Sequence, residues 1–304
     1  MSGLGVWPPD GISRYRLTNV PHALSLGVGV QSSTLLMMAE EGLVTPKPAA
    51  AIFSDTTAEP DSVYRWVNYL RSLKWSFPLH VVSKGDLSED NLKKFKSRKS
   101  GKQYVRTIIP TYIRNPDGSR GVLGRRCTGD YKIRMVEQAL RQKVLRRRLP
   151  SNIDPTMPLV ISWIGISTDE ADRMKPAKLP WVINRWPLIE LGMSREDCKA
   201  WVRQSRFYPA MLKAGFTEPP RSACKQCPYH SDVEWIRMRD EEPEAFQFAV
   251  EWERRYTKVL TEWDESTRGT PFLHNSLVPL DQVIFDPNKG RNHFSNECEG
   301  MCGV

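Results

Sequence analysis

The clearest structural signal in this chain is the stretch "HALSLGVGVQSSTLLMMAEEG" at residues 22–42. Its first five residues predict a buried strand, the glycine-rich segment predicts a turn, and the remainder predicts a helix. Gly27 and Gly29 allow backbone amides to approach a ligand, and the helix directs its positive end at the turn. The helix start adds the hydroxyl groups of Ser32 and Ser33. This chemistry suits phosphate, although the lysine of an ATPase loop and the glycine spacing of a dinucleotide fold are absent. A plain tight turn is the alternative interpretation.

Strand-like and helix-like segments alternate along the chain. Strands are predicted at residues 22–26, 49–54, 79–83 and 159–167, and helices at 32–42, 60–73, 130–149, 193–205, 231–241 and 243–264. Such alternation predicts an α/β fold, in which a parallel, Rossmann-like sheet carries helices on both faces. Residues 97–122 lack apolar periodicity and are predicted to form a long basic loop. We therefore expect a nucleotide-binding α/β domain over residues 20–215 and a C-terminal helical, cysteine-bearing extension over residues 216–304.

The charge balance is basic, with 44 Lys and Arg against 35 Asp and Glu, a net charge of +9. Part of the excess is clustered at residues 91–102, 124–126 and 146–148. Such clusters suit a polyanionic partner, either nucleic acid or a phosphorylated nucleotide, and a solvated surface is the alternative for each of them. No apolar run approaches the roughly 18 residues of a membrane span, and no secretion signal is visible. We therefore expect a soluble, cytoplasmic protein with no membrane association, in which clustered cysteines favour metal binding or catalysis over disulfides.

The glycine-rich stretch resembles the pyrophosphate loop, S-G-G-x-D-S, of the adenine nucleotide α-hydrolase (PP-loop ATP pyrophosphatase) superfamily. That superfamily includes the PAPS reductase-like proteins and the thiolation and DNA phosphorothioation enzymes. Val28, Val30 and Ser32 stand where the family favours Ser, Gly and Asp. Three further segments resemble family motifs in the family's order, namely "FSDTTAEPDSVYRWV" (53–67), "RRCTGDYKIRMV" (125–136) and "GISTDEADRM" (165–174). The resemblance covers roughly residues 22–302 and implies a HUP-type, Rossmann-like fold that binds an adenine nucleotide.

The resemblance also implies roles for individual residues. The nucleotide-binding candidates are Ser25, Gly27, Gly29, Gln31, Ser32, Ser33, Phe53, Asp55, Glu59, Asp169 and Arg173. Lys132, Arg126 and Asp55 are the candidates for catalysis at the α-phosphate, where loop amides and cations would stabilise the developing charge together with Mg²⁺.

The cysteines suggest a metal site. Cys224 and Cys227 form a C-x-x-C on a turn before a helix, which supplies two ligands from one loop. Cys198 lies inside a helix pattern and is predicted to be a buried apolar residue. Two alternatives remain: a zinc site built from the C-x-x-C and the C-x-x-x-C of the tail, or a 4Fe–4S cluster. The resemblance favours the cluster, with Cys127, Cys224, Cys227 and Cys302 as its ligands. His230 is expected to be a surface or capping residue rather than a ligand.

The tail "NECEGMCGV" (296–304) contains Cys298 and Cys302. It resembles the E-C-G-x-H end of PAPS reductases, which makes Cys298 the candidate nucleophile. Cys298 can also replace Cys302 as the fourth ligand. A thiolate is needed in either role, and nearby arginine or lysine would favour it. We expect the tail to fold back over the site.

Three functions follow. In the first, the chain binds ATP with Mg²⁺ and adenylates a substrate with release of pyrophosphate. It then supports sulfur transfer from a sulfur donor to DNA or tRNA, with the iron–sulfur cluster and Cys298 handling the sulfur. In the second, it is a sulfonucleotide reductase that forms sulfite from PAPS or APS and needs a thioredoxin-like reductant. In the third, it is a non-catalytic nucleotide-binding zinc protein. A homodimer is compatible with each of them.

Overall fold

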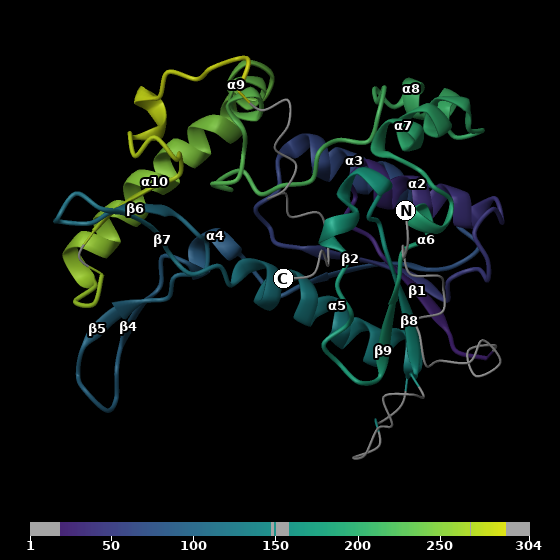
Figure 1. Ribbon diagram of the computed structural model, residues 1–304, viewed down its shortest axis with the longest axis horizontal. Coiled ribbons are helices and arrows are strands. Elements are labelled where there is room, and N and C mark those ends of the chain that lie inside the picture. The colour runs from purple at the N-terminus through teal and green to yellow at the C-terminus, as the bar shows by residue number, and fades with distance from the viewer. Residues whose placement is uncertain (1–18, 147–148, 150–157, 268, 290–304) are drawn as a thin grey trace.

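A five-stranded parallel sheet forms the centre of the computed structural model, which describes residues 19–146, 149, 158–267 and 269–289. The strands are β1 (His22–Ser25), β2 (Ala50–Asp55), β3 (Leu79–Ser83), β8 (Val160–Ile164) and β9 (Val182–Arg185). Their order in the sheet is β3-β2-β1-β8-β9, so the direction of sheet growth reverses between β1 and β8 (Figure 1). The predicted Rossmann-like α/β fold is confirmed.

Helices cover both faces of this sheet. Successive side chains of a strand point to opposite faces, and in these strands the side chains on both faces are largely apolar. On one face, Leu24 and Trp163 pack with the buried side of α2 (Val30–Glu40) and α3 (Asp61–Ser72). On the other face, Ile52 and Ile164 pack with α5 (Arg134–Ala139). The remaining helical segments of this half are η1 (Thr128–Ile133), η2 (Leu140–Leu145), η3 (Thr168–Arg173), α6 (Pro187–Glu190), α7 (Arg195–Gln204) and α8 (Tyr208–Lys213).

α7, which was predicted at residues 193–205, begins with a capping box. The hydroxyl of Ser194 accepts a hydrogen bond from the N–H of Asp197, and the Asp197 carboxylate accepts one from the N–H of Ser194. The two helices predicted near the C-terminus are also found, as α9 (Asp232–Glu241) and α10 (Pro243–Trp263). Within the described residues, no helix is both long enough and apolar enough to cross a membrane.

A second core lies around α10, beside the main sheet (Figure 1). It combines Leu92, Val105 and Ile108 with Trp235 and Trp252 from α9 and α10. Residues 97–122 were predicted to be a loop, but they contribute to short antiparallel strands. The short strands around the second core are β4 (Lys94–Lys96), β5 (Gln103–Val105), β6 (Tyr112–Arg114), β7 (Arg120–Val122) and β10 (Thr270–Phe272). Two short helical segments, α4 (Leu87–Asp90) and η4 (Leu280–Gln282), accompany them. The second core therefore joins parts of both predicted domains, and the boundary at residue 215 stays a prediction.

Candidate functional site

The loop between β1 and α2 is held in an unusual backbone conformation. Val28 is left-handed, with φ 57°, which costs a β-branched residue about 1–3 kcal/mol. Gly29 follows with extended angles, φ −79° and ψ −176°, and caps α2 without a side-chain hydrogen bond. The loop and the first turn of α2 are buried. The surrounding packing therefore stabilises a strained loop at the carboxyl end of β1.

The backbone N–H groups of residues 27–32 have no acceptor in the part of the chain that the structure describes. The first helical hydrogen bond joins the N–H of Ser33 to the carbonyl of Gly29, at 3.0 Å. Buried backbone donors are nearly always paired in native proteins. A run of unpaired donors at the positive end of a helix is suited to an anion such as phosphate.

Gly165, directly after β8, allows the main sheet to approach the start of α2. A Cβ atom at this position would lie 2.9 Å from the backbone nitrogen of Ser32 and 3.0 Å from its Cα. The approach occurs between β1 and β8, where the strand order reverses. Open α/β sheets bind ligands at the carboxyl ends of such strands.

A small pocket lies beside the loop. Its lining comes from the ends of β1 and β2, from the helical segment around η1, and from the segment before the C-x-x-C. The lining residues are Ser25, Leu26, Gly27, Phe53, Ser54, Lys132, Val136 and Ser222. Four predicted residues, Ser25, Gly27, Phe53 and Lys132, are therefore brought together. Lys132 is buried and brings a positive charge to the same place.

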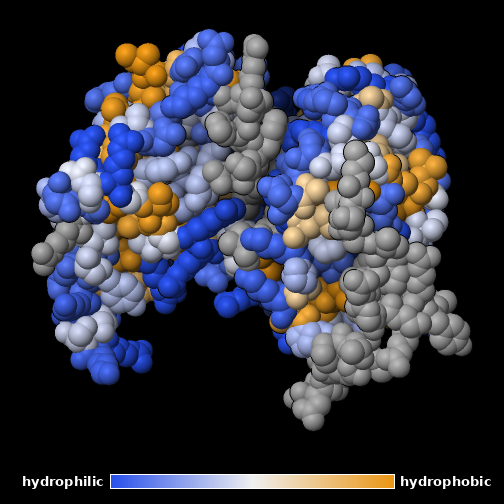
Figure 2. Space-filling view, viewed as in Figure 1, coloured by the Kyte–Doolittle hydropathy of each residue, from blue (hydrophilic) through white to orange (hydrophobic). Residues whose placement is uncertain are grey.

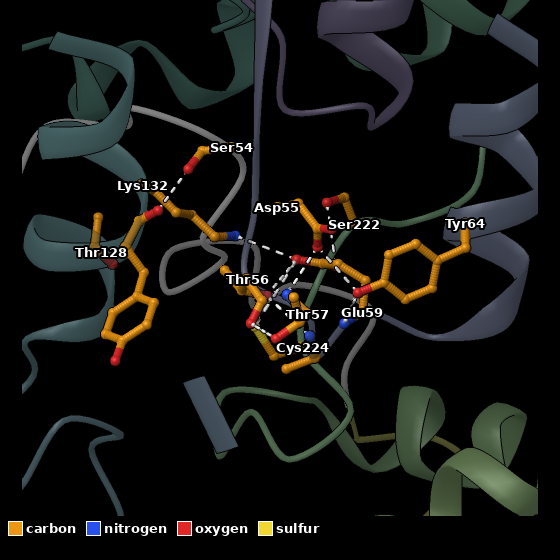
Figure 3. Close-up of polar contacts among 12 residues, drawn as sticks. Ser54, Asp55, Thr56, Thr57, Glu59, Tyr64, Thr128, Lys132, Ser222 and Cys224 are labelled. Atoms are coloured by element: carbon orange, nitrogen blue, oxygen red, sulfur yellow. Dashed lines mark hydrogen bonds and ion pairs between the residues drawn. The ribbon is translucent and has the colours of Figure 1, made fainter. Parts of the chain in front are cut away.

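Glu59 is the buried carboxylate of this site, and Figure 3 shows the groups around it. Its Oε1 lies 3.8 Å from the Nζ of Lys132. The hydroxyl of Thr56 donates to Oε1 at 3.4 Å, and the hydroxyl of Ser222 donates to Oε2 at 3.4 Å. A buried charge needs such partners, because an unpaired carboxylate would lose its hydration without compensation.

Asp55 lies at the carboxyl end of β2 and is partly exposed. Its Oδ1 accepts hydrogen bonds from the N–H of Thr57 at 2.7 Å and from the hydroxyl of Tyr64 at 3.0 Å (Figure 3). Burial and the neighbouring Asp55 raise the pKa of Tyr64 well above its usual value, so its hydroxyl remains a donor. Within the described residues, Oδ2 of Asp55 accepts no hydrogen bond. This oxygen is available to a cation.

Gln31 belongs to a hydrogen-bond network around Glu170. Its side-chain amide donates to the Ser167 hydroxyl and to Oε2 of Glu170, both at 3.3 Å. Its carbonyl oxygen accepts from Arg195 at 3.2 Å. Arg173, a predicted nucleotide ligand, pairs with Oε1 of Glu170 at 2.9 Å. These contacts connect the start of α2 to the segment after β8.

The other predicted residues have contacts that are mainly structural. Ser33 accepts a hydrogen bond from the indole of Trp66 at 3.1 Å, and the Ser32 hydroxyl donates to the carbonyl of Gly29 at 3.4 Å. Asp169 accepts from the backbone of Arg195, at 3.0 Å. Arg126 is exposed, just before η1. Their predicted roles in nucleotide binding and catalysis stay predictions.

The described cysteines do not build a metal site as they lie. Cys127 and Cys224 both pack against the second core. The Sγ of Cys224, however, lies 3.3 Å from the Thr56 hydroxyl and 3.8 Å from Oε1 of Glu59. Burial and this carboxylate raise the pKa of the Cys224 thiol well above its usual value in the metal-free protein. Among the described residues, no group of three His, Cys, Asp or Glu side chains could hold a metal ion.

The predicted nucleophile Cys298 and the predicted ligand Cys302 lie outside the described residues, so the iron–sulfur and zinc sites stay predictions. Cys198 is confirmed as a core residue, with burial raising its pKa to about 12. His230 is also buried, which was not expected, and its Nε2 lies 2.9 Å from the carbonyl of Cys224. Burial lowers the pKa of His230 to about 3, so the ring is neutral and supports the C-x-x-C turn.

Several residues of the site were not predicted from the sequence. Gly165 had no visible signal, because its role depends on an approach by α2 from far along the chain. Ser54 directly precedes the predicted Asp55 at the carboxyl end of a strand, where open α/β sheets bind ligands, so its position is a signal that could have selected it. Ser222 lies in a proline-rich segment without any pattern. Comparisons of the chain with protein-family models, curated proteins and solved structures find no match.

Proposed function

We propose that this chain binds ATP at the carboxyl ends of β1, β2 and β8 and transfers the adenylyl group to an acceptor. The observation that carries the proposal is the run of buried backbone donors at residues 27–32, which have no acceptor among the described residues. Phosphate oxygens would accept from these donors at the positive end of α2. The resemblance of four co-linear segments to PP-loop enzymes supports an adenine nucleotide as the ligand.

The reaction proceeds at the α-phosphorus. An oxygen of the acceptor attacks this atom, the bond to the oxygen that bridges the α- and β-phosphates breaks, and pyrophosphate leaves. Backbone donors and Lys132 stabilise the charge that develops on the phosphate oxygens. Mg²⁺ neutralises phosphate charge when it is bound, and we assign Oδ2 of Asp55 to it, because oxygen ligands suit this ion.

The reductase and zinc-protein alternatives rest on other parts of the chain. Sulfite formation requires Cys298, which lies outside the described residues. A zinc or iron–sulfur centre requires a ligand from the tail, Cys298 or Cys302, besides the C-x-x-C, and both tail cysteines lie outside the described residues. The adenylation proposal uses neither centre. Sulfur transfer to the adenylated acceptor would follow this step.

The test removes one backbone donor and keeps the helix. Val30 is the first residue of α2, a position that proline favours, and Gly29 before it already has the extended angles that proline requires. Val30→Pro deletes one N–H, and Val30→Ala trims the side chain but keeps that N–H. A hydrogen bond to a charged group contributes about 1.5–3 kcal/mol, so Val30→Pro should weaken ATP binding at least tenfold.

ATP affinity is measured by titration calorimetry, and product formation by pyrophosphate release with and without single-stranded DNA or tRNA. Val30→Ala should bind ATP nearly as well as the unmodified chain. If Val30→Pro and Val30→Ala bind ATP equally, the amides do not hold phosphate. Sulfite release from PAPS without pyrophosphate release from ATP would favour the reductase alternative.

A further inference from the structure

The most basic surface of the described chain is a projecting hairpin, residues 93–106, which we call the basic hairpin. It contains β4 and β5 and projects from the side of the molecule that carries α10 (Figure 1). Figure 2 shows strongly hydrophilic residues at the projecting tip in the same place. The hairpin carries seven cationic side chains and no acidic one: Lys93, Lys94, Lys96, Arg98, Lys99, Lys102 and Arg106. The rest of the chain has a net charge of only +2, so this segment accounts for most of the excess.

All seven cationic side chains are exposed. Lys93 pairs with Asp90, but no carboxylate pairs with the other six within the described residues. Some exposed cations elsewhere in the protein pair with carboxylates, as Arg255 does with Glu89 and Arg254 with Asp281. Unpaired cations crowded on one hairpin repel each other, and a polyanion relieves that repulsion.

The hairpin is fixed to the protein at its base. The indole of Trp263 donates to the carbonyl of Phe95 at 3.3 Å, and the N–H of Val105 donates to the Asp264 carboxylate at 2.6 Å. The N–H of Glu265 donates to the carbonyl of Gln103 at 3.1 Å. The basic hairpin is therefore an anchored element with a fixed orientation.

The outward face of the hairpin carries aromatic rings. Phe95 and Tyr104 are directly opposed in the antiparallel ladder, and their rings stack with centroids 5.5 Å apart. The guanidinium of Arg106 lies 4.5 Å from the centre of the Phe95 ring. Val105 points to the other face, where it joins the second core. Both rings remain partly exposed, which leaves aromatic surface beside the cations.

We propose that the basic hairpin binds single-stranded nucleic acid. Its cations would contact successive phosphates, while unstacked bases would lie against the rings of Phe95 and Tyr104. A duplex buries the faces of its bases and could use the cations alone. That the bound strand is the acceptor of the adenylyl group rests on the proposed function. Binding of the strand to the hairpin, however, requires no ATP.

Fluorescence anisotropy without ATP tests the inference, with labelled dT20, rU20 and a 20-base-pair duplex as probes at several salt concentrations. The unmodified chain should bind the single strands more tightly than the duplex. Arg98→Ala/Lys99→Ala, at the exposed tip, should reduce the salt dependence of dT20 binding by about 1.4 in the log–log slope, because each single-strand phosphate contact contributes about 0.7. Lys74→Ala/Lys213→Ala removes two exposed cations outside the hairpin and should leave binding unchanged.

Tyr104→Leu tests stacking separately from charge. It should weaken dT20 binding about tenfold with no change in the salt slope, because one base loses its aromatic partner. Thermal unfolding verifies that each variant is folded. The inference is overturned if the tip variant binds dT20 like the control variant, if Tyr104→Leu binds like the unmodified chain, or if the duplex or anionic phosphatidylserine vesicles are preferred to the single strands. Because these binding assays contain no ATP, a negative result does not affect the test of adenylation by pyrophosphate release. A negative result in that test likewise does not affect the binding assays.

Discussion

Gly165→Ala should weaken the contact between the sheet and the loop that joins β1 to α2. The added Cβ would lie 2.9 Å from the nitrogen of Ser32, 3.0 Å from its Cα and 3.1 Å from its Cβ, whereas ordinary contacts begin at 3.4 Å. The neighbouring atoms belong mainly to the backbone, so no flexible side chain can yield. The start of α2 must therefore move by roughly half an ångström, and overpacking of this kind costs about 1–3 kcal/mol of unfolding free energy.

The same displacement should affect the ligand. The backbone donors of residues 27–32 would move relative to the phosphate, and a loss of about 1.4 kcal/mol corresponds to a tenfold weaker affinity for ATP. Urea unfolding measures the first effect, and titration calorimetry measures the second. Gly124→Ala is the matched control, because its Cβ would meet its nearest neighbour, the hydroxyl of Thr107, at an ordinary 3.7 Å. If Gly165→Ala were as stable as Gly124→Ala and bound ATP equally well, the close approach of Gly165 to Ser32 would be required for neither stability nor ATP binding.

Three further predictions concern buried groups. Lys132→Met should lower the free energy of unfolding by about 3 kcal/mol, because Glu59 is left buried without this cation. The double variant Lys132→Met/Glu59→Gln should recover most of this loss in urea unfolding, and no recovery would refute the pairing. Burial and Arg185 lower the pKa of His22 in the folded protein to about 4, so protonation below pH 6.5 favours the unfolded chain. Between pH 7 and pH 5 the free energy of unfolding should therefore fall by about 2 kcal/mol more in the wild-type protein than in His22→Gln. Equal decreases in the two proteins would contradict this. Burial and Glu59 raise the pKa of Cys224, so mass spectrometry should show slow alkylation of this thiol by iodoacetamide at pH 8 and faster alkylation in Glu59→Gln. Rapid alkylation of Cys224 in the wild-type protein would contradict the raised pKa.

Local sequence patterns predicted the elements that form the main sheet and its helices. β1, β2, β3 and β8 are short apolar runs next to helices, and the capping residues of α7 are visible in the sequence. β9 was missed because "VINR" has no alternating pattern. β4, β5, β6 and β7 pair locally, but each has only three residues, which is too short for a clear alternating pattern. β10 was missed because its partner lies far along the chain, as Thr270 pairs with Arg114. Pairing over that separation leaves no local signal.

The candidate site could be predicted to a similar extent. Gly27 and Gly29 were selected because they lie between a predicted strand and a predicted helix, and Phe53 and Asp55 because their segment resembles a family motif. Ser33 was assigned to phosphate, but its hydroxyl bonds to Trp66, a partner on another helix. Gln31 and Arg173 belong to a network around Glu170, which no spacing rule indicates. Residue type and position predicted which edge of the sheet forms the site, whereas the individual partners depended on tertiary packing.

The second core also determines the order in which the chain can fold during synthesis. Leu92, Val105 and Ile108 leave the ribosome long before α10, the helix against which they pack. Until then their apolar side chains remain exposed to water and available for misassociation. A fragment that stops at residue 215 would retain this exposed surface permanently. We therefore expect such a truncated chain to aggregate, or to require a chaperone, even though it contains every strand of the main sheet.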